Sequence, residues 1–390
     1  MGRGQPGPYF DRISGTSWCI SLVGGQSLAA GHTPRVWGPF PTPLGASTLT
    51  IDTASAATID FYRDQNRQVV KAQPGEELLG PFRNLPGVWK GSGTGWNMIA
   101  LPFKPEPGSP LNYRLLLNQF DETLNFELVD KGVPNRGLDE AGKVNTDQVV
   151  ATLDYEQVIH QIAVTDRPTS TVTGAPGAAI HHEPGLFLNM LNETGNGPTV
   201  ARLATIPHGD AALALGKAFD VEGPPRIGRI NGLPIGVPQD LDQRYLEPYK
   251  FFSENPFFGT VPAGVPGFPG FDPVEPHKLL EFANQTSPVA RTTVIELDTL
   301  VESGGISNIP FIVRQANAVS MKSTFWINEL QATDAQGNPR MQLQYAQIVM
   351  LEFFDRFDGL PGRIAWPHVS INTLEKMDDE PAHMADVVSG

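Results

Sequence analysis

Two histidines occupy equivalent places in the two halves of the chain. His208 follows Pro207 in the run IPHGD, and His368 follows Pro367 in the run WPHVS. Proline restricts the backbone just before each imidazole, and Gly209 permits a tight turn after the first. A neutral imidazole held in this way is able to bind a haem iron or to hydrogen-bond a ligand. The same placement also suits a structural role, in which the ring nitrogens tie down the end of a strand.

A second pair of chemically capable side chains belongs to the repeated pattern Leu-x-Tyr-x-Gln, at residues 153–157 and again at 343–347. Residues two apart in a strand share a face, so Leu153, Tyr155 and Gln157 lie together on the apolar face. The Gln157 amide therefore needs a partner among apolar neighbours. It either orients a ligand or makes a structural hydrogen bond to a facing strand or loop.

The run His181-His182-Glu183 resembles a metal cluster in composition only. Adjacent residues on a strand point to opposite faces, so the two histidines are not expected to hold one ion without a bulge. One of them is expected to face the interior, and we take His182 as the candidate. No glycine-rich phosphate loop, nucleophile elbow or zinc-protease motif occurs, and no carboxylate pair stands out as a general acid and base. Whether the protein is an enzyme stays open.

The composition excludes several classes of partner. The 390 residues carry a formal net charge of -14, which repels polyanions, so we expect no nucleic-acid partner. No run approaches the roughly 18 apolar residues of a membrane span. The first residues lack the apolar core of a secretory signal, and the single cysteine, Cys19, excludes an intrachain disulfide. These features predict a soluble, cytoplasmic protein with no membrane span.

The elements that position these residues have the pattern of strands. The 40 glycines and 36 prolines disfavour long helices and predict many turns. Residues 1–82 are predicted to be a β-rich N-terminal segment. In residues 83–220, apolar or alternating runs of strand length are separated by turn residues, as in an antiparallel sheet that closes on itself. We predict a mainly β fold with few short helices, in which residues 83–220 form a first β-barrel.

The second half is predicted to contain a strap and a smaller barrel. Residues 221–276 are rich in Pro, Gly and Phe, and a flexible linker would be poor in aromatic residues. We predict an ordered strap that buries several of its phenylalanines and covers a barrel mouth or bridges the two units. Residues 277–390 begin with one short helix, EPHKLLEFANQ, and continue as a second, shorter barrel-like unit with a polar tail.

The order of motifs is the same in both halves, which predicts an internal duplication. A glycine, a Pro-Phe pair, Leu-x-Tyr-x-Gln and a Pro-His pair follow one another twice. Residues 84–217 and 290–376 are therefore expected to superpose as related antiparallel sheets. In that superposition Tyr155 lies over Tyr345, and His208 over His368.

Several runs together resemble bacterial proteins described as haem-binding, which combine a nitrobindin-like or lipocalin-like (calycin) β-barrel with an additional C-terminal part. They span about residues 84–376 in one order: GVWKGSGTGWNMIALPF, LDYEQ, HHEPGLFLNM, TIPHG, GGISNIPF, TFWINEL, LQYAQ and WPHVSINTLEK. The resemblance implies a barrel whose apolar interior holds haem b or another hydrophobic ligand. In nitrobindins a histidine near the end of the chain, on a late strand, holds the iron. No motif here matches that position, so His208 is the best placed candidate metal ligand.

The combined prediction is a protein that binds a hydrophobic small molecule, with haem b as the candidate cofactor, in the first barrel. Small barrels enclose one ligand in a mostly apolar pocket with a few placed polar groups. The predicted polar groups are His208, His182, Gln157 and Tyr155, and the predicted walls are Trp96, Phe120, Phe126 and Phe187. Two alternatives stay open. One is an enzyme, peroxidase-like or an isomerase, acting on a hydrophobic substrate in the same cavity. The other is a non-catalytic structural or interaction protein whose barrels are filled by side chains.

Overall fold

The computed structural model describes residues 69–103, 112–135, 148–190, 197–262, 264–353, 356 and 358–377. All of them belong to one compact unit, residues 49–390. Most of the predicted N-terminal β segment, including Cys19, lies outside the described residues. Within the part of the chain that is described, no helix is long and apolar enough to cross a membrane.

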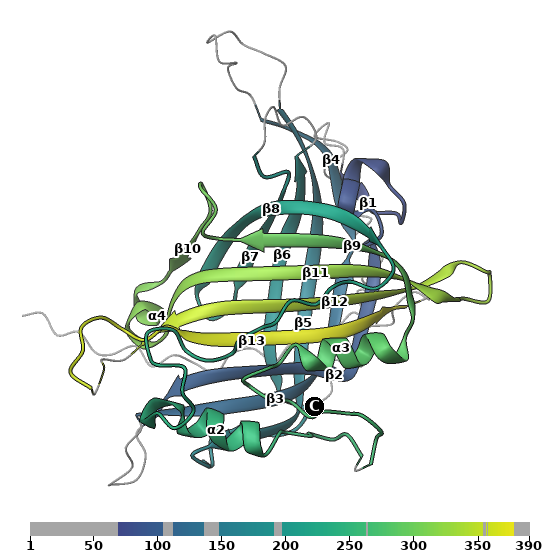
Figure 1. Ribbon diagram of the computed structural model, residues 1–390. Helices are drawn as coiled ribbons and strands as arrows, with labels where there is room; N and C mark the ends of the chain where they lie inside the picture. Colours follow the sequence, from purple (N-terminus) through teal and green to yellow (C-terminus); the bar gives the residue numbers. More distant parts are fainter. Residues whose placement is uncertain are drawn as a thin grey trace, which may run out of the picture. The chain divides into compact units, whose positions relative to one another are not determined.

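Ten of the described strands close into one antiparallel barrel (Figure 1). The last strand around the barrel pairs with the first, so the sheet closes and its long strands have no free edge. In order around the barrel, the strands are β5 (Gln148–Arg167), β3 (Tyr113–Phe126), β2 (Gly87–Pro102), β13 (Trp366–Lys376), β12 (Pro339–Glu352), β11 (Asn317–Thr333), β9 (Val289–Asp298), β8 (Asp210–Glu222), β7 (Val200–Ile206) and β6 (Ala179–Met190).

Three further strands extend the sheet, and a 3₁₀ helix closes one end of the barrel. The strands β1 (Val69–Lys71) and β4 (Leu128–Asn135) pair beside β5, and β10 (Gly305–Asn308) pairs with β8. The helix η1 (Glu77–Phe82) packs into one end of the barrel. Its fully buried Phe82 contacts the ring of Phe187 on β6, with ring centroids 5.2 Å apart. This end of the interior is therefore apolar and filled.

Both halves of the chain contribute to this one barrel, so the predicted second barrel-like unit is not formed. Residues 83–220 supply six of the ten strands, and residues 277–390 supply four. The halves join where β2 pairs with β13 and where β8 pairs with β9. About eight strands are needed before a barrel has room for its own side chains, so four strands are too few to close by themselves.

The repeated motifs occupy similar positions only in part. Both Leu-x-Tyr-x-Gln copies lie in barrel strands, β5 and β12, and both bury their tyrosine. His208, however, lies in the turn between β7 and β8, whereas His368 lies within β13. The predicted equivalence of these two histidines is therefore wrong.

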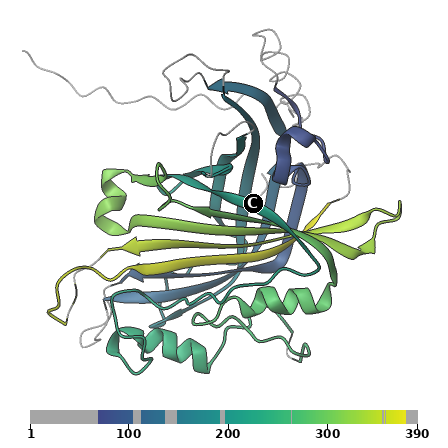
Figure 2. The ribbon, with the colours of Figure 1, turned by 45° about the horizontal axis from the view of Figure 1, so that its top comes forward.

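The strap forms η2 (Arg244–Leu246), α2 (Glu247–Glu254) and a series of turns on the outer face of β2, β3 and β13 (Figures 1 and 2). Its Phe252 and Phe271 are buried, which confirms the predicted burial of several strap phenylalanines. Phe271 stacks on Trp96, with ring centroids 6.0 Å apart. The strap covers the side of the barrel and not its mouth, because the outward-facing side chains of β2 and β3 are large and apolar there.

The helix α3 (Lys278–Thr286), predicted from the run EPHKLLEFANQ, continues this cover. The side-chain amide of Gln344 on β12 donates a hydrogen bond to the Leu280 carbonyl, 3.0 Å away. Tyr345 and Gln347 share the inward face of β12. Gln344 therefore lies on the opposite, outward face, toward the helix. The strap and α3 therefore cover the outer faces of these strands. The barrel interior is lined by side chains on the inner faces.

Candidate functional site

Glycines on the inner face make room for large side chains in the barrel interior. A Cβ added at Gly95 on β2 would lie 2.1 Å from the ring of Phe120, and one at Gly185 on β6 would lie 2.5 Å from the ring of Tyr155. Real Cβ atoms do not approach other atoms so closely, so only glycine fits at either place. Small residues on one strand thus let aromatic side chains from the next strand occupy the interior.

A buried ion pair lies near the middle of the barrel. Arg202 on β7 contacts Glu183 on β6, with 2.6 Å between Nη2 and Oε1. The same guanidinium donates from Nε to the Tyr155 hydroxyl (3.0 Å) and from Nη1 to Gln347 Oε1 (2.6 Å). His181 donates from its Nε2 to the other oxygen of Glu183, at 3.2 Å. Four strands are therefore tied together through one charged cluster.

The charges of this cluster follow from burial and mutual contact. Burial alone raises the pKa of Glu183, but the Arg202 guanidinium and the hydrogen bonds from His181 and Tyr155 lower that pKa to about 2. Burial raises the pKa of Tyr155 above its ordinary value, although Arg202 opposes the rise. Glu183 is therefore an acceptor-only carboxylate, and the Tyr155 hydroxyl keeps its proton.

A second buried carboxylate, Glu122 on β3, is held by neutral donors. It accepts hydrogen bonds from Gln157 Nε2 (2.6 Å), the Tyr345 hydroxyl (2.7 Å) and Asn372 Nδ2 (2.7 Å). Burial raises the pKa of Glu122, and these three hydrogen bonds oppose the rise. Gln157 thus has a protein partner on the neighbouring strand β3, which fits the structural alternative for this amide, although the partner is not on a facing strand.

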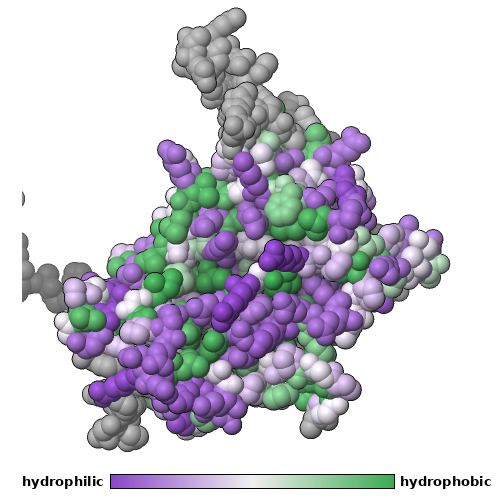
Figure 3. All heavy atoms as spheres, viewed as in Figure 1, coloured by the Kyte–Doolittle hydropathy of each residue, from purple (hydrophilic) through white to green (hydrophobic). Residues whose placement is uncertain are grey.

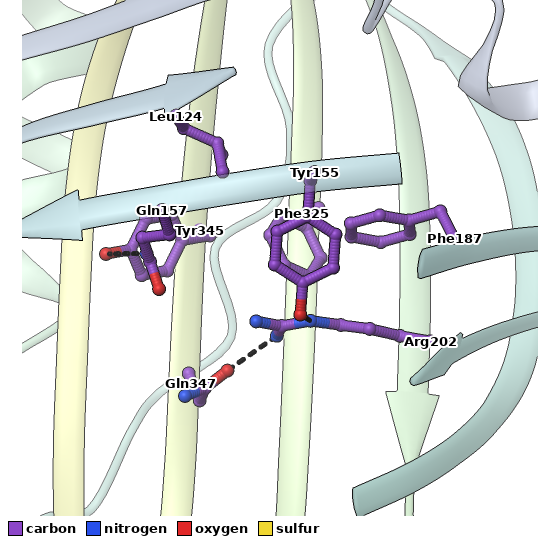
Figure 4. Close-up of a pocket in the computed structure, with 8 residues that line it drawn as sticks. All are labelled: Leu124, Tyr155, Gln157, Phe187, Arg202, Phe325, Tyr345 and Gln347. Atoms are coloured by element: carbon purple, nitrogen blue, oxygen red, sulfur yellow. Dashed lines mark hydrogen bonds between the residues drawn. The ribbon is translucent and has the colours of Figure 1, made fainter. Parts of the chain in front are cut away.

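A small cavity of about 10 Å³ lies between the two polar clusters (Figure 4). A space of that size holds about one water molecule. Haem or another large hydrophobic ligand therefore does not fit at the centre of the barrel. Two predicted site residues, Tyr155 and Gln157, do line this cavity. The complete lining is Leu124, Tyr155, Gln157, Phe187, Arg202, Phe325, Tyr345 and Gln347.

The opposite end of the barrel from η1 carries three imidazoles, and we call it the histidine end. His181 at the start of β6 and His208 in the β7–β8 turn have near-parallel rings, with centroids 5.8 Å apart and an interplanar angle of 27°. His368 on β13 completes the group. Burial, together with the other two imidazoles, lowers the pKa of His368 to about 3, so this ring is neutral at physiological pH.

The histidine end has an exposed apolar border. The helix α4 (Pro310–Gln315) begins beside the β7–β8 turn, where the backbone N–H of Ile309 donates to the Gly209 carbonyl at 3.0 Å. Ile309 is 50% exposed, Phe311 64% and Val313 44%. Figure 3 shows hydrophobic residues over the region of α4 and β10. Apolar surface therefore lies next to His208.

The other predicted site residues divide between the two faces of the sheet. His182 is exposed on the outside, where its Nε2 lies 2.8 Å from Glu156 Oε1, so the prediction that it faces the interior is wrong and the inward histidine is His181. All four predicted wall residues are buried, but Trp96 is buried against the strap and not in the barrel interior, unlike Phe120, Phe126 and Phe187. Among the described residues, no group of three or more His, Cys, Asp and Glu side chains is arranged to hold a metal ion.

Sequence reasoning missed the charged residues of the interior. Arg202 lies in the run TVARLATI and Glu122 in the run NQFDETLNF. A period of two places Arg202 on the same face as Val200 and Ala204, both of which are buried. That parity was the available signal, since a charged residue in register with buried apolar neighbours must find a partner inside.

A search of models of known protein families finds none that matches this chain, and no curated protein matches it either. The class that the fold defines is a closed, ten-stranded antiparallel β-barrel. The resemblance to haem-binding barrels stays a prediction.

Proposed function

We propose that this barrel is a binding protein whose ligand docks at the histidine end, and that this ligand is a hydrophobic small molecule with haem b as the first candidate. The observation that supports the proposal is the meeting of His181, His208 and His368 beside the exposed apolar residues of α4. Binding sites for such ligands combine apolar surface with a few placed polar groups. The histidine end has both.

Haem at this end requires one neutral imidazole, not a cluster of metal ligands. Haem iron is commonly held by a single proximal histidine, and a histidine binds a metal in its neutral form. His368 is neutral and lies on the last described strand, which fits the late-strand histidine that the resemblance implies better than His208 does. The iron would supply the reactive centre, while the chain would supply the imidazole and the apolar contacts.

Absorbance spectroscopy tests the proposal. Titrating haem into the purified protein is expected to give a shifted Soret band at micromolar concentrations. The His368→Ala variant should lose that shift, and the exposed His182→Ala variant should keep it. His208→Ala tests the ligand that the sequence favoured. The absence of any shift in the parent protein, or its survival in both His368→Ala and His208→Ala, contradicts haem binding at this end.

A second candidate function is a structural or interaction protein with a filled barrel. The observation in its favour is the central cavity of only about 10 Å³ between side chains that are already paired. A colourless protein from which organic extraction releases no lipid or other small molecule, and which gives no Soret shift, would support this second candidate over the first.

A further inference from the structure

The two glutamines of the Leu-x-Tyr-x-Gln motifs face one another across the central cavity. Gln157 comes from β5 and Gln347 from β12, strands that are not neighbours in the barrel, and both side chains line the same small space (Figure 4). Each amide uses one of its two ends in a strong contact. Gln157 Nε2 donates to Glu122 at 2.6 Å, and Gln347 Oε1 accepts from Arg202 at 2.6 Å.

The chemistry of these partners fixes which amide end is left over. A guanidinium only donates hydrogen bonds, so the end of Gln347 that meets Arg202 must be its oxygen. Glu122 already accepts from Tyr345 and Asn372, and Gln157 meets it with its nitrogen, which donates to Oε1 at 2.6 Å. The remaining atoms are an acceptor, Gln157 Oε1, and a donor, Gln347 Nε2. Neither has a hydrogen-bond partner among the described residues.

We propose that the paired motifs build a binding site for one neutral, water-sized polar molecule, and that water occupies it. A buried water needs a cavity of about 10–15 Å³ and two to four polar partners. The cavity of about 10 Å³ meets the first condition. The free acceptor and donor of the two amides meet the second condition. The Nη2 group of Arg202 donates one of its two hydrogens to Glu183, and its other hydrogen adds a third possible partner.

The surrounding charges select against ions. An anion would lie near the carboxylates of Glu122 and Glu183, and a cation would lie near the Arg202 guanidinium. The rings of Phe187 and Phe325, together with Leu124, close the remaining walls and leave no space for a larger molecule. A molecule that both donates and accepts, without net charge, is the class that fits.

The bound water would connect the two buried polar clusters. The Glu183–Arg202 cluster ends at Gln347, and the Glu122 cluster ends at Gln157. The 3.4 Å contact between Gln157 Nε2 and the Tyr345 hydroxyl lies within the Glu122 cluster, and among the described residues no hydrogen bond joins the two clusters directly. A water between the free amide atoms would join both clusters into one network across the barrel. His181 connects this network to the histidine end through Glu183, but the water itself would be held by the two amides and not by the histidines or their ligand.

Crystallography of the whole protein at a resolution that orders buried waters tests the inference, with xenon pressurisation as a second probe. Dry apolar cavities bind xenon, whereas wet polar ones do not. We expect one density peak within hydrogen-bond distance of both amides, and no xenon in the parent protein. In the Gln157→Leu/Gln347→Leu double variant, the water peak should disappear. The exposed Gln336→Leu variant is the control and should keep it.

The parent crystals decide the question even if the double variant does not fold. An empty cavity in the parent, or xenon bound there, overturns the inference. A water peak that persists unchanged in the folded double variant also overturns it, because the two amides would then not be its partners. Haem binding at the histidine end can succeed or fail without affecting any of these outcomes.

Discussion

At the scale of single residues, the barrel interior is unusual in burying two carboxylates with one guanidinium. The Glu183–Arg202 pair has side chains that are 0% and 4% exposed, and both members have further hydrogen bonds. A buried ion pair contributes little compared with an apolar pair of the same shape, but removing one partner leaves an uncompensated charge. The consequence is a cluster that tolerates little change.

Replacing Arg202 with Met is therefore expected to lower the free energy of unfolding by about 3–5 kcal/mol, because Glu183 stays buried without its cation. The matched control is Arg291→Met, which breaks an ion pair with Asp220 whose side chains are 36% and 44% exposed. That change should cost much less stability, because water and salt screen an exposed pair. Urea unfolding followed by circular dichroism measures both. Equal losses in the two variants would contradict a stabilising role for the buried pair.

The half-buried imidazole of His368 makes stability depend on pH. Its pKa in the folded protein is about 3, below the ordinary value of 6.5, because of burial and the imidazoles of His181 and His208. As the pH falls below 6.5, the unfolded chain binds a proton that the folded barrel does not, so stability falls. Glu183 acts at lower pH. Its contribution is present above 4.5 and is lost as the pH falls toward 2.

The His368→Gln variant separates these two ranges. Between about pH 6.5 and pH 3 it should lose less stability than the parent, because the group responsible is gone, while the Glu183 loss between about pH 4.5 and pH 2 should be common to both proteins. Urea midpoints measured across this pH range provide the comparison. Parallel curves for the two proteins would show that His368 is not held neutral by the fold.

At the scale of elements, the strap stabilises the outer wall by burying aromatic rings. Phe271 is fully buried and stacks on Trp96, while Phe258 in the same segment is 46% exposed. The Phe271→Ala change should therefore cost about 3–5 kcal/mol and expose the strap to proteases, as is usual for a buried phenylalanine. Phe258→Ala should have a much smaller effect on both. Limited proteolysis and thermal unfolding test this, and similar cleavage rates in the two variants would argue against docking through Phe271.

The sequence predicted most of these elements, but not which side of the barrel the strap covers or which face of a strand points inward. Alternation in LDYEQVIHQI correctly placed Tyr155 and Gln157 on the buried face, and the phenylalanine content correctly predicted an ordered strap. The side of the barrel that the strap covers was not predictable, because β2 is buried on both faces and its pattern does not say which face is inside. The choice between His181 and His182 failed for the same reason. The two-residue period of a strand places them on opposite faces but does not show which face is inside.

At the scale of the whole molecule, strand partners decided the architecture. The repeated motif order suggested two barrels, yet closure joins β2 to β13, for example Met98 opposite Val369. Pairs so distant in the chain leave no local signal in hydrophobic period or turn residues. The histidine end was not predictable for the same reason, because His181, His208 and His368 meet only after the barrel has closed.

Closure also predicts that neither half of the barrel folds alone. In a fragment of residues 49–223, β2 would lack β13 and β8 would lack β9, so two long strands would expose unpaired edges, which promote aggregation. We expect this fragment to aggregate or to lack a cooperative unfolding transition. Co-expression with residues 224–390 should restore a soluble complex in which each edge finds its partner. Size-exclusion chromatography and thermal unfolding measure both outcomes. A monomeric fragment 49–223 that unfolds cooperatively would show that the first half is a barrel in its own right.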